Sequence, residues 1–312
     1  MSLAVAALSG CGSLSQPSPP SSGNQGTAQV AYAGSLATLN ETVIGPKFEK
    51  ATGYKYQGRG GGSLGLAHEI SAHTISANVF ESIGFAPIQI ASPRKPWGLA
   101  FASSPLVLAY NSSSRFAPAL NAIRTGKQPL SHLFAIMAEP GFHLGRTNPN
   151  TDPQGQAFWW MIHLAALRYH LSPVLPGKIL GSVSNSHQIF SEEGILTNLQ
   201  SGGLDAASAF LPEALARHLD YIPLPSRLNF SDPKDASWYH RATVILSNGQ
   251  VVHGVPLTVD ITAIGPSASA ANKFIQYVTS KKGQTLMKKA GYTVFTPIAQ
   301  GHTNAIPKSL RP

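Results

Sequence analysis

The sequence predicts an α/β protein built from two lobes. From Ala28 onward, short apolar segments alternate with segments of helical periodicity, which is typical of strands and helices that share one core. The chain has 312 residues, a length that favours two domains. A strong strand ends at Tyr110, and the chain comes back near Val255. Two crossings of this kind predict a hinged clamshell.

Strands and helices alternate in the first part of the chain. Helical spacing of Leu36, Leu39, Val43 and Phe48 predicts a helix that Pro46 restarts or kinks, because proline lacks an N–H. The other elements expected here are strands over 29–33, 54–57 and 78–80 and a helix over 64–72.

The second part begins with the strand at 106–110. Residues 156–171 are apolar on nearly every side, which indicates a buried helix. The elements expected after it are a short helix over 194–200, a strand over 205–210, a long return strand over 251–264 that Pro256 interrupts, and helices over 267–278 and 281–289.

The net charge of the chain and the placing of its basic residues favour some classes of partner over others. The 23 Lys and Arg against 14 Asp and Glu give a net charge of +9, which attracts small anions. The basic residues are scattered, and no aromatic residues interleave with them, so we expect no nucleic-acid binding. The scarcity of carboxylates also fits an acidic habitat, where paired carboxylates would become protonated and the fold would be weakened.

The N-terminus resembles the end of a bacterial lipoprotein signal. Leu8-Ser-Gly-Cys11 has the pattern in which the cysteine becomes lipidated, and Cys11 is the single cysteine, which excludes an internal disulfide. The following stretch is rich in Ser, Pro, Gly and Gln, as flexible tethers are. A lipid anchor and a tether predict a body held at the outer side of a membrane. The expected division is a signal remnant over 1–11 with Cys11 as lipidation site, a tether over 12–27, lobe 1 over 28–108 plus 256–312, and lobe 2 over 109–255.

Two glycine–serine turns open helices in the first lobe. Gly34-Ser35 follows a strand, where Ser35 can cap the helix or donate to an anion. The run from Gly58 to Ser63 repeats this order with flexible glycines, without the ending of a P-loop. Such turns on neighbouring parallel strands meet at one sheet edge, where ligands bind in open α/β folds.

Helix starts in the second lobe carry acidic residues. In Gly145-Arg-Thr-Asn-Pro-Asn-Thr-Asp-Pro-Gln-Gly155, Asp152 is placed to cap a helix whose first residue is Pro153. Ser191-Glu192-Glu193 begins another helix. Neither carboxylate is informative alone, and the histidines have no spacing typical of a metal site.

A serine hydrolase is the alternative from another class. Gly61-Gly-Ser-Leu-Gly65 matches the nucleophile-elbow pattern, and Asp152 with His163 or His253 would complete a triad with Ser63. The serine follows only the second strand, which is early for that elbow, and no oxyanion-loop motif precedes it.

Four segments together carry a resemblance to a known family. They are Ala33-Gly-Ser-Leu36, Gly62-Ser63, the segment from Gly145 to Gly155, and Ser201-Gly-Gly-Leu-Asp205. The chain resembles, from 28 to about 297, the molybdate/tungstate-binding proteins of ABC importers, in particular the tungstate-type branch. The resemblance implies a type II-like periplasmic-binding-protein clamshell with mixed sheets flanked by helices, an ABC permease as partner, a monomer, and neither catalysis nor a cofactor.

The resemblance also implies the site. Asp152 and Glu192 match two carboxylates that the branch is thought to place directly on the metal, which in molybdate and tungstate can expand from four ligands to six. Sulfate and phosphate cannot expand in this way and would be rejected, although sulfate or thiosulfate stays open as an alternative cargo. Glu193 could replace Glu192 by a slip of one residue, Asn148 stands where the family has an acid, and Phe210 stands where it has a tyrosine. The ligand-binding residues implied are Gly34, Ser35, Ser63, Asp152, Pro153, Gln154, Gly155, Glu192 and Phe210.

Overall fold

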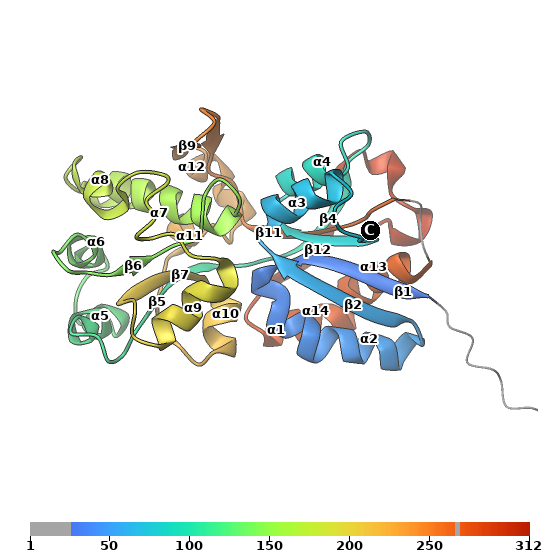
Figure 1. The fold of residues 1–312 in the computed structure, drawn as a ribbon, viewed down its shortest axis with the longest axis horizontal. Helices are drawn as coiled ribbons and strands as arrows, with labels where there is room; N and C mark the ends of the chain where they lie inside the picture. Colours follow the sequence, from blue (N-terminus) through green and yellow to red (C-terminus); the bar gives the residue numbers. More distant parts are fainter. Residues whose placement is uncertain (1–25, 266–268) are drawn as a thin grey trace, which may run out of the picture.

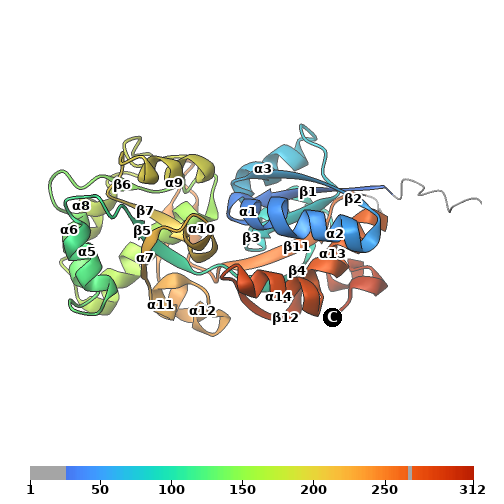
Figure 2. The ribbon, with the colours of Figure 1, turned by 90° about the horizontal axis from the view of Figure 1, so that it is seen from below.

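The computed structural model describes residues 26–265 and 269–312, which form two halves side by side (Figure 1). Each half is built on a mixed β-sheet flanked by helices, as the sequence predicts and as the view from below shows (Figure 2). Cys11 lies outside the described residues. None of the helices within the described ranges is long and apolar enough to cross a bilayer.

The first sheet has six strands in the order β12-β4-β11-β3-β1-β2. Strand β1 runs parallel to β2 and β3, whereas β11 is antiparallel to β3 and β4, and β12 is antiparallel to β4. The strands are β1 (Thr27–Ala33), β2 (Lys55–Gly61), β3 (Val79–Ile83), β4 (Trp97–Ser103), β11 (Thr258–Ala263) and β12 (Thr293–Gly301).

Helices cover both faces of this sheet because β1 and β3 place apolar residues on both sides. Ala31 and Phe80 pack in a cluster with residues of α3 and α4, while Val30 and Val79 pack in the main core with Phe274 of α13. The helices of this half are η1 (Gly34–Leu36, 3-10), α1 (Ala37–Leu39), η2 (Asn40–Ile44, a π-helix), α2 (Gly45–Thr52), α3 (Ser63–Ser71), α4 (Ala86–Ala91), α13 (Ser269–Thr279), α14 (Lys281–Lys289), and the 3-10 turns η4 (Thr303–Ala305) and η5 (Lys308–Leu310).

The second sheet has four strands in the order β6-β7-β5-β8. They are β5 (Leu106–Tyr110), β6 (Leu144–Gly145), β7 (Ala206–Phe210) and β8 (Asp220–Pro223), and a separate hairpin pairs β9 (Thr243–Ile245) with β10 (Val251–His253). The long helix α7 is the expected buried helix, with Phe158 and Trp160 in the core. The helices are α5 (Ala117–Arg124), α6 (His132–Met137), α7 (Pro153–Tyr169), α8 (Leu175–Leu180), α9 (Glu192–Gln200), α10 (Leu211–Ala216), α11 (Ser226–Asn229), η3 (Pro233–Asp235, 3-10) and α12 (Ala236–Tyr239).

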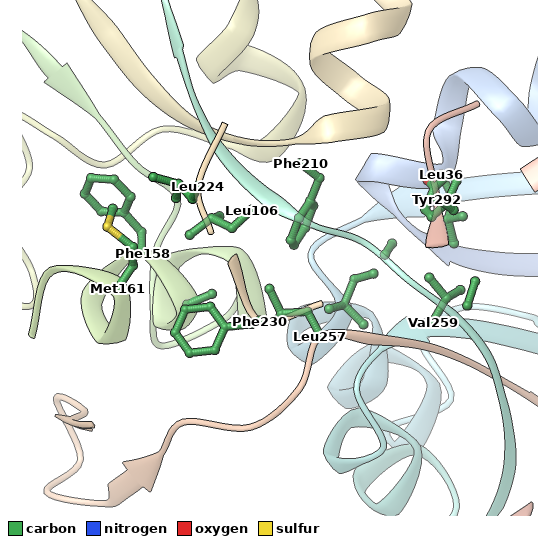
Figure 3. Packing of buried hydrophobic residues seen from close by; sticks show 14 of the residues in the cluster. Leu36, Leu106, Phe158, Met161, Phe210, Leu224, Phe230, Leu257, Val259 and Tyr292 are labelled. Carbon is green, nitrogen blue, oxygen red and sulfur yellow. The ribbon is translucent and has the colours of Figure 1, made fainter. Parts of the chain in front are cut away.

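The chain passes between the sheets from β4 to β5 and again from β10 to β11. At the crossing, the Ser104 N–H donates to the Leu257 carbonyl at 3.0 Å, and the Leu257 N–H donates to the Phe230 carbonyl at 2.8 Å. Figure 3 shows apolar side chains following this crossing from Phe230 through Leu257 to Val259, all members of one core cluster. The expected lobe boundary at 108/109 falls inside β5, which pairs along its length with β7 of the second sheet, so the chain changes sheet earlier, after Ser103.

Two prolines divide their elements as predicted. The return segment over 251–264 is interrupted at Pro256, which cannot donate to a ladder, and its two parts, β10 and β11, belong to different sheets. The helix restarts at Pro46, which lies in the first turn of α2 after 3-10, α and π segments. The strand β1 begins at Thr27, so the last residue of the expected tether belongs to the sheet.

The glycine run is also not a flexible loop, because Gly58 to Gly61 belong to β2. A Cβ on Gly60 would lie 2.9 Å from the Tyr32 ring, and one on Gly58 would lie 2.0 Å from the Glu41 carboxylate. Side chains of neighbouring elements thus lie directly on this strand, which explains glycines in a sheet.

Candidate functional site

A cleft of about 380 Å³ separates the two halves at the carboxyl end of β2. One wall is the turn between β2 and α3, and the other combines the loop between β6 and α7 with the segment that leads into α9. The turn around Gly62 and the segments of Asp152 and Glu192, far apart in sequence, therefore meet as expected. The residues that line the cleft are Arg59, Gly60, Gly61, Gly62, Gly65, Leu66, Glu69, Thr147, Asn148, Thr151, Asp152, Ile189, Phe190, Ser191 and Glu192.

The carboxylate of Glu192 reaches from the second half to the start of η1 in the first. The N–H groups of Gly34 and Ser35 donate to its Oε2 and Oε1, each at 2.9 Å. Two consecutive N–H groups at a helix start are a common way to hold an anion. A Cβ on Gly34 would lie 2.6 Å from Glu192 Oε2, so only glycine allows this approach. In this structure the donors predicted for an oxyanion hold a carboxylate of the protein itself.

Ser35 does not cap its helix, so that interpretation is wrong. Ala33 is the N-cap residue of η1, and it makes no side-chain cap. The Ser35 hydroxyl is buried and has no hydrogen-bond partner among the described residues, while the Ser35 carbonyl accepts from the Tyr292 hydroxyl at 3.0 Å. Burial, together with Glu213, Glu81 and Glu192 nearby, holds the pKa of Tyr292 well above its usual range, so Tyr292 stays a neutral donor.

Ser63 is the first residue of α3 and is buried beside the sheet. Its hydroxyl oxygen accepts from the Ile83 N–H at 3.0 Å, which leaves the hydroxyl proton able to donate. The start of α3 also touches the opposite wall, because the Gly65 N–H donates to the Thr151 carbonyl at 3.2 Å. Ser63 thus lies where the two halves meet.

Asp152 caps α7, and Pro153 is the first residue of that helix, as the sequence predicts. Asp152 Oδ1 accepts from the Gln154 N–H at 2.8 Å, so this N–H already has a partner inside the second half. The Gln154 side chain accepts from the Ser208 hydroxyl and donates to Glu213, which leaves the residue buried. The structure therefore does not bring Gln154 into the cleft.

Gly155 and Phe210 are also packed within the second half. A Cβ on Gly155 would lie 2.5 Å from the Thr147 carbonyl, so this glycine lets the loop cross α7 closely. Phe210 is fully buried near Leu106 (Figure 3), and its N–H donates to Glu213 at 2.7 Å. Neither residue lines the cleft.

Glu192 is the first residue of α9, and Ser191 caps that helix by accepting from the Gly194 N–H at 3.1 Å. Ser191-Glu192-Glu193 therefore begins this helix as predicted, two residues before the range 194–200 expected from periodicity. Of the two acids considered, Glu192 reaches the first half through a contact that the structure describes.

Sequence reasoning missed Arg146, which directly follows β6 and is fully buried. Its guanidinium donates to the carbonyls of Ser182 at 2.8 Å and Val183 at 3.2 Å and lies over the Trp159 ring. Burial lowers the pKa of Arg146 to about 10, so the side chain stays cationic at neutral pH. Within the described ranges, no carboxylate lies within ion-pair distance of it. The only signal in the sequence was its place inside the motif.

The contacts of the triad candidates do not support a hydrolase. His253 stacks on His240 with ring centroids 4.0 Å apart, and His163 packs on Trp159 at 6.0 Å. In the part of the chain that the structure describes, no hydrogen bond joins Ser63 to either histidine. A serine nucleophile needs a base within hydrogen-bond reach.

Two α/β halves joined by two crossings, with a cleft between them, are typical of a solute-binding protein, and Glu192 of the cleft wall is held by N–H groups at the start of η1. Residues 28–293 match the family of bacterial extracellular solute-binding proteins, and the chain belongs to this family.

Two relatives illustrate the range of the family. The molybdate/tungstate-binding protein WtpA of Pyrococcus abyssi is 24% identical over 297 residues, which covers 86% of this chain and 84% of that protein. An uncharacterized solute-binding protein of Saccharolobus solfataricus is 27% identical over 288 residues, with 84% of this chain and 69% of the relative covered.

Solved structures show the same fold. The periplasmic molybdate-binding protein of Azotobacter vinelandii superposes with a TM-score of 0.59 at 17% identity, covering 86% of this chain and 99% of that one. The sulfate-binding protein SubI of Mycobacterium tuberculosis gives a TM-score of 0.56 at 13% identity, covering 91% of this chain and 88% of that one. The clamshell expected from the resemblance is thus confirmed.

Proposed function

We propose that the protein captures molybdate or tungstate and delivers it to an ABC permease. The observation that carries the proposal is that Glu192, which lines the cleft together with Asp152, accepts from the Gly34 and Ser35 N–H groups of the other half. Anion donors and two carboxylates in one cleft suit an anion whose central atom accepts carboxylate oxygens. The name of the Pyrococcus abyssi relative supports this choice of cargo.

The charges explain why the cargo would be a metal oxyanion. A carboxylate beside a dianion in a dry cleft repels it by several kcal/mol. That repulsion turns into attraction only when the carboxylate oxygen bonds the central atom, which molybdenum and tungsten permit. On binding, the Gly34 and Ser35 N–H groups donate to the oxyanion instead of to Glu192, and Glu192 turns toward the metal.

The remaining parts of the proposal concern the whole protein. It acts as a monomer without catalysis or cofactor and is anchored outside the cell through a lipid on Cys11 and the tether that follows. The two lobes open and close about the crossing segments near Ser104 and Leu257. The net charge of +9 raises the rate at which anions meet the cleft.

Thermal unfolding with added anions tests the proposal. A ligand present at 100 times its Kd adds about 2.7 kcal/mol to the free energy of unfolding. We expect tungstate and molybdate to raise the Tm, and sulfate, thiosulfate and phosphate to leave it unchanged. A rise with sulfate or thiosulfate alone would replace the proposed cargo, and no rise with any of these anions would contradict the proposal. Mass spectrometry of protein treated with a fluorophosphonate checks the hydrolase alternative at Ser63.

A further inference from the structure

We infer that the hydroxyl of Thr147 donates a hydrogen bond to an oxygen of the bound oxyanion. This inference rests on the proposed function and adds a residue to its site. Thr147 lines the cleft together with Asp152 and Glu192.

Among the residues that the structure describes, none forms a hydrogen bond with the Thr147 hydroxyl. The residue is 1% exposed, and its Oγ1 is buried without a hydrogen bond to any residue that the structure describes. A buried hydroxyl without a partner destabilises a fold, whereas valine would fill the same space at no such cost. The hydroxyl therefore calls for an explanation other than stability.

The loop backbone at Thr147 is held in place by its neighbours. The backbone of the preceding Arg146 pairs on both sides with the strand-like segment 188–190, since Arg146 N–H donates to Gln188 and Phe190 N–H donates to Arg146. The Thr147 carbonyl lies against Gly155. The position of Thr147 is thus set by backbone contacts.

The donors that the sequence predicts for the second half are not available to a ligand in the cleft. The Gln154 N–H is already bound to Asp152, and Phe210 carries no hydroxyl and lies in the core. The acids Asp152 and Glu192 can bond a metal, but as carboxylates they cannot donate to its oxygens. In the first half, the buried Ser35 hydroxyl likewise has no partner among the described residues and lies beside the N–H that holds Glu192. Among the described cleft-lining residues of the second half, Thr147 carries the buried hydroxyl without a described partner.

The test compares the full chain with Thr147→Val, which removes the hydroxyl and keeps the shape. Tungstate is titrated by calorimetry, and the Tm is measured without ligand. We expect tungstate affinity to fall about tenfold or more, as for loss of a hydrogen bond to a charged group, while the ligand-free Tm stays the same or rises. Thr147→Ser should keep tungstate affinity within about threefold of the starting protein.

Tyr277→Phe is the matched control, because it removes another buried hydroxyl without a described partner, on α13 away from the cleft-lining residues. It should not lower the Tm and should leave tungstate affinity unchanged. Unchanged affinity in Thr147→Val overturns the inference, as does an equal loss in Tyr277→Phe or a loss accompanied by a lower ligand-free Tm. If the unaltered protein binds neither tungstate nor molybdate, the proposed function itself fails.

Discussion

Glu192 Oε1 accepts a hydrogen bond from the Ser35 N–H at 2.9 Å, although the two residues are 157 positions apart in the chain. The bond joins the two halves, and Glu192 Oε2 adds a second bond to Gly34. A carboxylate of the protein therefore joins the halves at the place where we propose that the oxyanion binds. An oxyanion bound there would compete with Glu192 for the same two N–H groups.

Glu192→Gln separates the two roles of this carboxylate. We expect tungstate affinity to fall about ten- to a hundredfold, because an amide cannot replace the charged oxygen ligand. Sulfate binding should stay the same or improve, because one competing negative charge is gone. Calorimetric titration of both anions measures this. Glu139→Gln, an exposed acid of the second half, is the control and should change neither affinity. Normal tungstate binding by Glu192→Gln would show that direct ligation is wrong.

Asp152 can be tested apart from its role as a helix cap. Asparagine caps helices as well as aspartate, so Asp152→Asn should retain stability while tungstate affinity falls. Asp152→Ala should lose affinity and also about 1 kcal/mol of stability, because the Gln154 N–H loses its acceptor. Urea unfolding and calorimetric titration of both variants distinguish the roles. Full tungstate affinity in Asp152→Asn would confine Asp152 to capping.

Two buried acids predict how stability depends on pH. Burial raises the pKa of Glu81 from 4.5 to about 7 and that of Asp260 from 3.8 to about 7. The folded protein thus binds these protons more tightly than the unfolded chain. The stabilisation that the two protonated carboxyl groups give is therefore fully present below about pH 4 and is lost as pH rises through 7. The loss is on the order of 3 kcal/mol for each group.

Urea unfolding between pH 4.5 and 7.5 checks this direction. Glu81→Gln should flatten the profile and add stability at pH 7.5, because the amide stays neutral and can still pair with Asn40, which now donates to Glu81 at 2.6 Å. A stability that rises steadily across this range, in both proteins, would contradict the assignment.

Arg146→Lys tests the buried guanidinium. Lysine keeps the charge but cannot reach the Ser182 and Val183 carbonyls with the same fork, so we expect a loss of about 2–3 kcal/mol in the free energy of unfolding. Arg124→Lys, on the exposed face of α5, should change stability by less than about 0.5 kcal/mol. Urea unfolding of both variants gives the comparison, and equal stabilities would mean that the guanidinium contacts contribute nothing.

The sequence by itself determined the alternation of strands and helices, several of those elements, and the start of α7 at Asp152-Pro153. These features follow from periodicity, turn residues and caps, which act between residues close in the chain. Elements such as β4, α5 and β12 were not predicted, and the chain changes sheet earlier than the expected boundary at 108/109.

Only the tertiary structure decided which groups are available in the cleft. It placed Glu192 on the Gly34 and Ser35 N–H groups, turned Phe210 into the core and left the Thr147 hydroxyl without a described partner. Such outcomes depend on how two halves approach across more than a hundred residues. Local preferences do not contain that information, because a hydrogen bond between halves is set by the packing of both.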